Sequence, residues 1–165
     1  MNNAHLHLVV NHLPIIIPIT GFLVLTLGFI LKLEVIKRVS YFLFVLAAIC
    51  TMPAFVTGEG AEEIAEGLNG VTEYLIHEHE EKAEAFAILN YVIGIVSILA
   101  IWASWKQKQF SKWLGIAILL FAIVVIFKGR EVGTSGGEIR HTEIRSTTSV
   151  SPVEKQTGQE NHCED

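Results

Sequence analysis

The sequence has little of what marks most hydrolases, zinc proteins and nucleic-acid-binding proteins. Its two cysteines, Cys50 and Cys163, form neither a CxxC nor a CxxCH motif, so the usual signatures of a zinc site and of c-type haem are missing. No basic patch with interleaved aromatic residues accompanies the net charge of −5, which excludes nucleic acid as an expected partner. Apart from His162–Cys163 near the end of the chain, no nucleophile motif lies beside a histidine. Any enzymatic activity would therefore be redox chemistry rather than hydrolysis.

Charged residues are also missing from four long apolar segments, 13–31, 39–56, 86–105 and 113–127. A helix needs roughly 20 apolar residues to cross the hydrocarbon core of a bilayer, and the segments lack the polar stripe of a soluble bundle. The chain is 51% hydrophobic, which is high for an ordinary soluble domain. The sequence predicts an all-α integral membrane four-helix bundle with the lipid bilayer as its first partner.

The domain organisation follows from these segments. We expect an outer N-terminal segment at 1–12, a four-helix transmembrane domain at 13–128 and a polar C-terminal tail at 129–165. The tail begins with a glycine-rich stretch that suggests a mobile lead, and its polar composition predicts disorder after about residue 146.

Basic residues predict the orientation, because they concentrate in cytoplasmic loops. The two connections that are rich in lysine and arginine join the first segment to the second and the third to the fourth; they carry Lys32, Lys37, Arg38, Lys106, Lys108 and Lys112. Both termini are then predicted on the outer side. We expect a multi-pass protein of the bacterial cytoplasmic (inner) membrane whose histidine-rich face is periplasmic.

The histidines all fall on that predicted outer face. They number seven and lie before the first segment, between the second and third, or after the fourth: His5, His7, His12, His77, His79, His141 and His162. Glutamates beside His77 and His79 need no special role, since a helix N-terminus favours carboxylates by roughly 0.3–1 kcal/mol each. The two histidines are spaced i, i+2, so on a helix they point in different directions. At most one of them is expected to face a given site.

Three short motifs resemble a widespread family of small four-span bacterial membrane proteins of unknown function. They are "NHLP" with His12 and Pro14, "TGEGAEE" with Thr57, Gly58 and Glu59, and "IHEHEEKA" with His77, His79 and Glu80. The resemblance covers roughly residues 5–128 and implies a four-helix membrane fold without an established activity.

Three functions fit these observations, and the most specific is a membrane electron-transfer protein that binds haem b. His12 with His77 or His79 would be the axial pair, and His141 is an alternative ligand. Arg140 would contact the haem propionates. Quinol or a periplasmic electron carrier would be the redox partner.

Two alternatives remain open. Imidazole and carboxylate together suit a divalent or copper ion. The residues expected to bind it are His12, His77, His79, Glu80 and Glu59. The second alternative is a cofactor-free membrane subunit or assembly factor, whose acidic face would dock other membrane subunits or a second copy of the chain.

Overall fold

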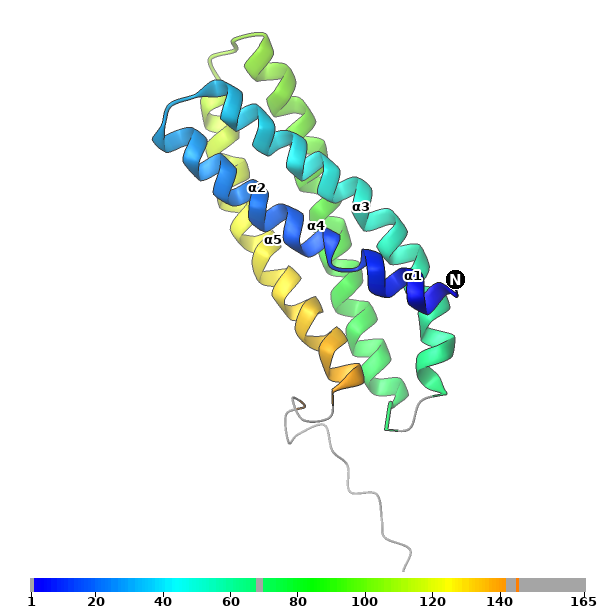
Figure 1. The fold of residues 1–165 in the computed structure, drawn as a ribbon. Coiled ribbons are helices and arrows are strands. Elements are labelled where there is room, and N and C mark those ends of the chain that lie inside the picture. The colour runs from blue at the N-terminus through cyan, green and yellow to red at the C-terminus, as the bar shows by residue number, and fades with distance from the viewer. Residues whose placement is uncertain (1, 68–69, 142–144, 146–165) are drawn as a thin grey trace, which may run out of the picture.

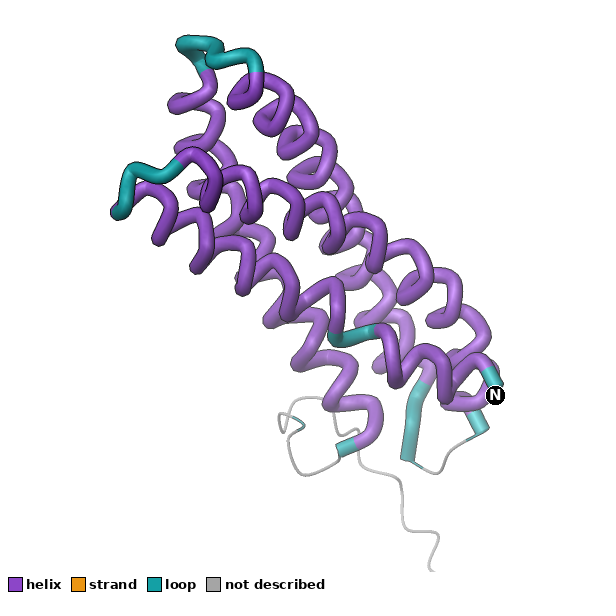
Figure 2. Tube along the Cα trace, turned by 45° about the horizontal axis from the view of Figure 1, so that its top comes forward, coloured by secondary structure: helices purple, strands orange, loops and turns teal. Residues whose placement is uncertain are grey.

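The fold is a bundle of long antiparallel helices, as a computed structural model of residues 2–67, 70–141 and 145 shows (Figure 1). These residues contain helices and no strand: α1 (Asn3–Val10), α2 (Leu13–Ile30), α3 (Glu34–Glu66), α4 (Glu73–Trp105) and α5 (Ser111–Arg140). The α2–α3 and α4–α5 connections lie at one end of the bundle. The start of α1 and the end of α5 lie at the other (Figures 1 and 2). The predicted all-α four-helix architecture is confirmed, whereas the tail after residue 146 lies outside the described residues.

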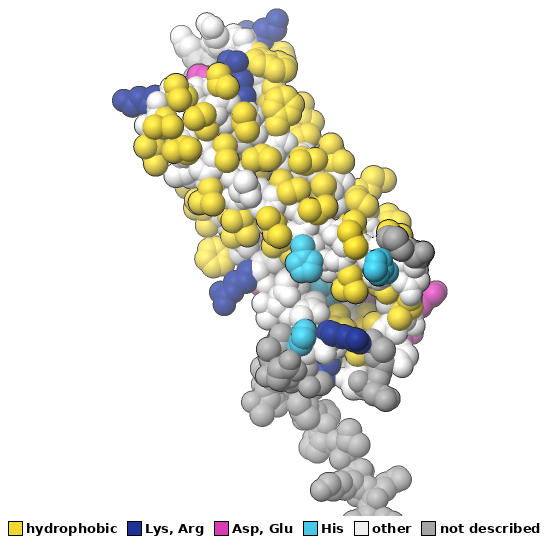
Figure 3. All heavy atoms as spheres, in the orientation of Figure 1, with side chains coloured by type: hydrophobic (Ala, Val, Ile, Leu, Met, Phe, Trp, Pro, Cys, Tyr) yellow, Lys and Arg dark blue, Asp and Glu magenta, His cyan; other side chains and the backbone are white. Residues whose placement is uncertain are grey.

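Within the described residues, four helices are long and apolar enough to cross a membrane: Asn3–Ile30, Glu34–Glu66, Glu73–Trp105 and Ser111–Arg140. The first combines α1 and α2, which a short break at Asn11 and His12 separates (Figure 2). The side chain of Asn2 caps α1 by accepting a hydrogen bond from the His5 amide at 3.0 Å. On the face seen in Figure 3, hydrophobic side chains cover the long helices, and histidines gather at the end where α1 lies.

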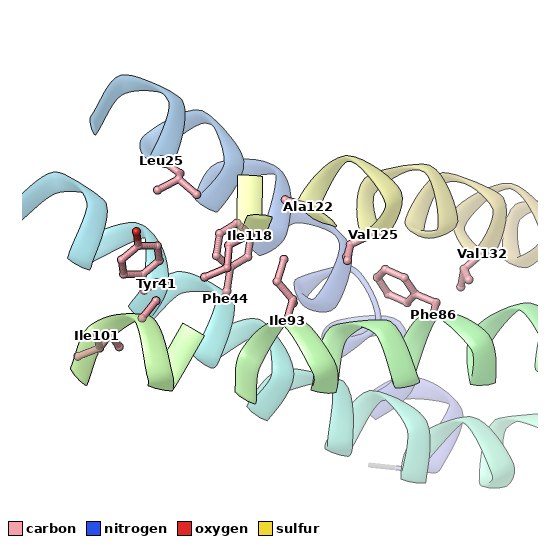
Figure 4. Close-up of a cluster of buried hydrophobic side chains, with 11 residues drawn as sticks. Leu25, Tyr41, Phe44, Phe86, Ile93, Ile101, Ile118, Ala122, Val125 and Val132 are labelled. Carbon is pink, nitrogen blue, oxygen red and sulfur yellow. The ribbon is translucent and has the colours of Figure 1, made fainter. Parts of the chain in front are cut away.

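The core runs along the bundle axis and consists of aromatic and branched side chains (Figure 4). Leu25, Phe44, Ile93 and Val125 are fully buried at its centre. Small residues let the helices approach closely: a Cβ built on Gly94 would lie 2.6 Å from Cβ of Ala48. Such small-residue contacts are typical of helices that pack inside a membrane, where close backbone approach supplies the van der Waals attraction.

A buried polar contact joins α2, α3 and α4. Pro18 lacks the N–H that would donate to the carbonyl of Pro14 one turn earlier in α2. The Asn90 side chain replaces this donor: its Nδ2 donates to the Pro14 carbonyl at 3.2 Å and to Thr51 Oγ1 at 3.2 Å. Asn90 is fully buried, and its Oδ1 has no hydrogen-bond partner. The amide therefore compensates for a proline on a neighbouring helix.

The helices continue past the apolar segments and form an extension that we call the head: residues 2–12, 57–66, 73–85 and 128–140. At 1.5 Å per residue the extension is about 15–20 Å long. The glycine-rich stretch that the sequence suggested as a mobile lead is helical here, because α5 continues to Arg140. The glycines leave room for side chains of α4 that pack against this part of α5. A Cβ on Gly129 would lie 3.1 Å from Phe86, and one on Gly136 would lie 3.0 Å from His79.

Candidate functional site

His79 points from α4 toward α5 and is half-buried. Its Nδ1 lies 2.9 Å from Oγ of Ser135, and the Ser135 hydroxyl donates to the carbonyl of Val132 at 3.1 Å. A carbonyl only accepts, so the hydroxyl proton is directed at Val132 and Oγ accepts the Nδ1–H of His79. This arrangement fixes the tautomer, leaving the lone pair of the ring on Nε2.

His7 has the same arrangement on the other side of the head. It lies on α1 against α3, and its Nδ1 is 3.0 Å from the carbonyl of Ala54 and 3.3 Å from Oγ1 of Thr57. Thr57 donates its own proton to the carbonyl of Pro53 at 2.7 Å. Both neighbours of Nδ1 therefore accept, and His7 also carries its proton on Nδ1 and its lone pair on Nε2. Gly58 makes room for this ring, since a Cβ there would lie 3.5 Å from Cε1 of His7.

Burial keeps both rings neutral near pH 7. His7 and His79 lie in the head, outside the four apolar segments. Burial lowers the pKa of His79, and positive charge on His7 and on Lys82 lowers it further. Burial is also the main cause that lowers the pKa of His7. The head thus contains two imidazoles on different helices, both with a lowered pKa.

The other histidines of the predicted sites are exposed. His77 is exposed on α4, with ring nitrogens 3.9 Å from Glu80 and 3.5 Å from Glu81. It diverges from His79, as the i, i+2 spacing predicts. His12 is exposed at the start of α2, and His141 is exposed at the end of α5.

The remaining predicted site residues are spread over three helices. Arg140 is exposed in the last turn of α5, Glu59 is exposed on α3 and Glu80 is exposed on α4. Among residues 2–67, 70–141 and 145, no three histidine, cysteine or acidic side chains are grouped so that they could hold a metal ion. Of the side chains predicted to bind a divalent or copper ion, His77 and Glu80 lie 3.9 Å apart, and the described residues add no third ligand to them.

Sequence reasoning did not single out His7. Three histidines precede the first apolar segment, His5, His7 and His12, and the sequence favoured His12 because it lies at the start of that segment. One signal in the sequence fits the outcome: Thr57 and Gly58 offer a hydroxyl and an uncovered backbone on the same turn of α3. Only the packing of α1 on that turn shows which imidazole meets them.

An acidic groove opens between the head parts of α3 and α4. It has a volume of about 420 Å³, and its lining residues are Glu62, Glu66, Glu73, Tyr74, His77 and Glu80. A hydrogen bond with Glu80 raises the pKa of Glu62, and the negative charge of Glu80 raises it further. Carboxylates that lie close together repel each other, and a bound cation relieves this repulsion.

The motifs that carry the family resemblance all lie in the head or at its border: Thr57 and Gly58 contact His7, His79 contacts α5, and His12 and Pro14 begin α2. Membership of that family stays a prediction. Comparisons with models of known protein families, with curated proteins and with solved structures found no match.

Proposed function

We propose that this chain is a multi-pass protein of the bacterial cytoplasmic membrane whose periplasmic head would bind haem b for one-electron transfer, held by His7 and His79. The observation that carries the proposal is the common state of these two imidazoles. Each is half-buried, each has a lowered pKa, and each donates its Nδ1–H to a protein oxygen.

This state is the one that an iron ligand needs. A histidine ligand binds through the lone pair of a neutral ring, and its other nitrogen usually donates to a carbonyl, carboxylate or water that orients it. The Ala54 carbonyl has this role for His7, and Ser135 has it for His79. The two rings come from different helices, α1 and α4.

We therefore assign the haem to His7 and His79 rather than to His12 and His77, whose rings are exposed. Haem would supply a one-electron couple, and His7 and His79 would hold it, each oriented by the hydrogen bond of its Nδ1. Arg140, at the same end of the bundle, is our proposed contact for the propionates, and quinol or a periplasmic carrier is the proposed electron partner.

An absorption spectrum tests the proposal directly. The protein is expressed with an adequate haem supply, purified in mild detergent, and its spectrum is recorded before and after dithionite. We expect a Soret band that shifts on reduction and that is lost in His7→Ala and in His79→Ala. His12→Ala and His77→Ala serve as matched controls and should keep the band.

Each other outcome is informative. If the band were lost only in the control variants, His12 and His77 would be the residues that hold the haem. A well-folded protein that remains colourless would reject haem, and metal analysis of the same sample would show whether a divalent or copper ion takes its place.

The acidic groove favours a second candidate function, a cofactor-free membrane subunit that docks a basic segment of a partner. Glu80 raises the pKa of Glu62 there, so a cationic segment that binds should lower this pKa and release protons. Calorimetry with an oligolysine peptide tests this. We expect binding that weakens in Glu62→Gln and in high salt, with a proton release that buffers of different ionisation enthalpy reveal. The control is Glu131→Gln, because the carboxylate of Glu131 pairs with Lys128 at 2.7 Å. Unchanged binding in Glu62→Gln would contradict this role.

A further inference from the structure

At the end of the bundle opposite the head, an apolar groove lies on the outer surface between α3 and α4. It has a volume of about 280 Å³, and its lining residues are Phe42, Val45, Ile98, Ile101, Trp102 and Trp105. We propose that this groove binds an acyl chain of an anionic phospholipid from the surrounding bilayer, and that Arg38, Lys106 and Lys108 hold the lipid phosphate. The inference rests on the proposed membrane insertion and is independent of haem.

The lining residues have the chemistry of a site for hydrocarbon. All six side chains are apolar or aromatic, and Phe42 and Trp105 form its wall with ring centroids 6.5 Å apart. The groove extends along α4 from Ile98 to Trp105, which is about 10 Å at 1.5 Å per residue. Because Phe42, Trp102 and Trp105 are exposed on the outside of the bundle, lipid rather than a protein core would cover them in a membrane.

Cationic side chains lie at one end of this groove. Arg38 is one turn from Phe42 on α3, and its guanidinium reaches α4, where Nε donates to Oγ of Ser104 at 2.8 Å and Nη2 donates to the Ser104 carbonyl at 3.1 Å. Ser104 immediately precedes Trp105. The guanidinium is therefore fixed between the two helices that form the groove, at the level where its aromatic wall ends.

Two lysines add to this charge. Lys108 lies over the ring of Trp102, with Nζ 5.8 Å from the centroid, and Lys106 follows Trp105 directly. The nearby carboxylate of Glu34 accepts from Ser104 at 3.3 Å and is already paired with Lys37. Tryptophans next to lysines are typical of the membrane–water interface, where each basic residue attracts anionic lipid. An apolar groove that ends in three cations matches a phospholipid, whereas free phosphate would not need the groove.

Fluorescence quenching tests the proposal on the full chain. The Trp113→Phe variant leaves Trp102 and Trp105 as the only tryptophans, and both line the groove. The protein is titrated with phosphatidylglycerol or phosphatidylcholine that carries brominated acyl chains. We expect phosphatidylglycerol to quench the tryptophan fluorescence at a lower mole fraction than phosphatidylcholine does. The double variant Lys106→Gln/Lys108→Gln should weaken this preference by about fivefold per charge removed.

Controls separate the site from general electrostatics. Lys32→Gln removes a cation at the same end but on the α2–α3 connection, and it should leave the preference unchanged. Inorganic phosphate should not relieve the quenching, since it offers no chain for the groove. Arg38→Gln should also weaken the preference for phosphatidylglycerol. If this variant does not fold, the lysine variants still test the proposal. Equal quenching by the two lipids, or the same loss in Lys32→Gln as in the lysine pair, would overturn the proposal. A chain absent from the membrane fraction would instead reject membrane insertion.

Discussion

Asn90 on α4 supplies the hydrogen bond that Pro18 removes from α2, and this contact gives a prediction that can be worked out in detail. Asn90→Ala removes two hydrogen bonds, to the Pro14 carbonyl and to Thr51 Oγ1, each at 3.2 Å. Each contributes about 1 kcal/mol on average in proteins and about 0.6 kcal/mol between membrane helices. The Pro14 carbonyl is then left unpaired in a buried position, which costs about 1–3 kcal/mol.

One effect acts in the opposite direction. Oδ1 of Asn90 is buried without a partner, so truncation also removes an unsatisfied acceptor. We expect a net loss of about 2 kcal/mol in the free energy of unfolding. Pro18→Ala should reduce this loss by about 1–2 kcal/mol, because the substitution restores a backbone N–H at position 18 that can donate to the Pro14 carbonyl within α2.

The assay is reversible unfolding in mixed micelles with increasing sodium dodecyl sulfate, applied to the single variants and the double variant. Ser97→Ala is a matched control: Ser97 is fully buried on the same helix, but its hydroxyl has no partner. It should change stability by less than about 0.5 kcal/mol. If the stability change of the double variant equals the sum of the two single changes to within about 0.5 kcal/mol, the Asn90 side chain does not replace the N–H that Pro18 lacks.

Two further predictions concern the packing of the helices and the pH dependence of stability. Gly94→Ala should destabilise by about 1–3 kcal/mol, because its Cβ would meet Ala48 at 2.6 Å. A Cβ at Gly133 would lie 3.7 Å from its nearest neighbour, which is ordinary contact. Gly133→Ala should therefore stabilise the protein by about 0.5–1 kcal/mol in the same unfolding assay. The lowered pKa of His79 means that the unfolded chain binds more protons below pH 6.5, so stability should fall as the pH decreases through that value. His79→Gln should flatten this part of the profile, and an unchanged slope would contradict the assignment.

The sequence alone determined the number of long helices, their apolar segments and the separation of a basic end from a histidine-rich acidic end. These features depend on composition along the chain. An uncharged segment of about 20 residues satisfies its backbone groups best as a helix, wherever its neighbours lie. The divergence of His77 and His79 was predictable for the same reason, because it follows from the angular period of one helix.

Tertiary structure decided which side chains face inward. Rotation of a helix about its axis depends on what packs against it, so only the contact of α1 with Thr57 and Gly58 selects His7, and only α5 selects His79. Composition suggested a mobile glycine-rich lead, but contact with Phe86 and His79 keeps that stretch helical. The pairing of Asn90 with the carbonyl that Pro18 leaves free depends in the same way on a neighbouring helix, because 76 residues separate Asn90 from Pro14 in the sequence.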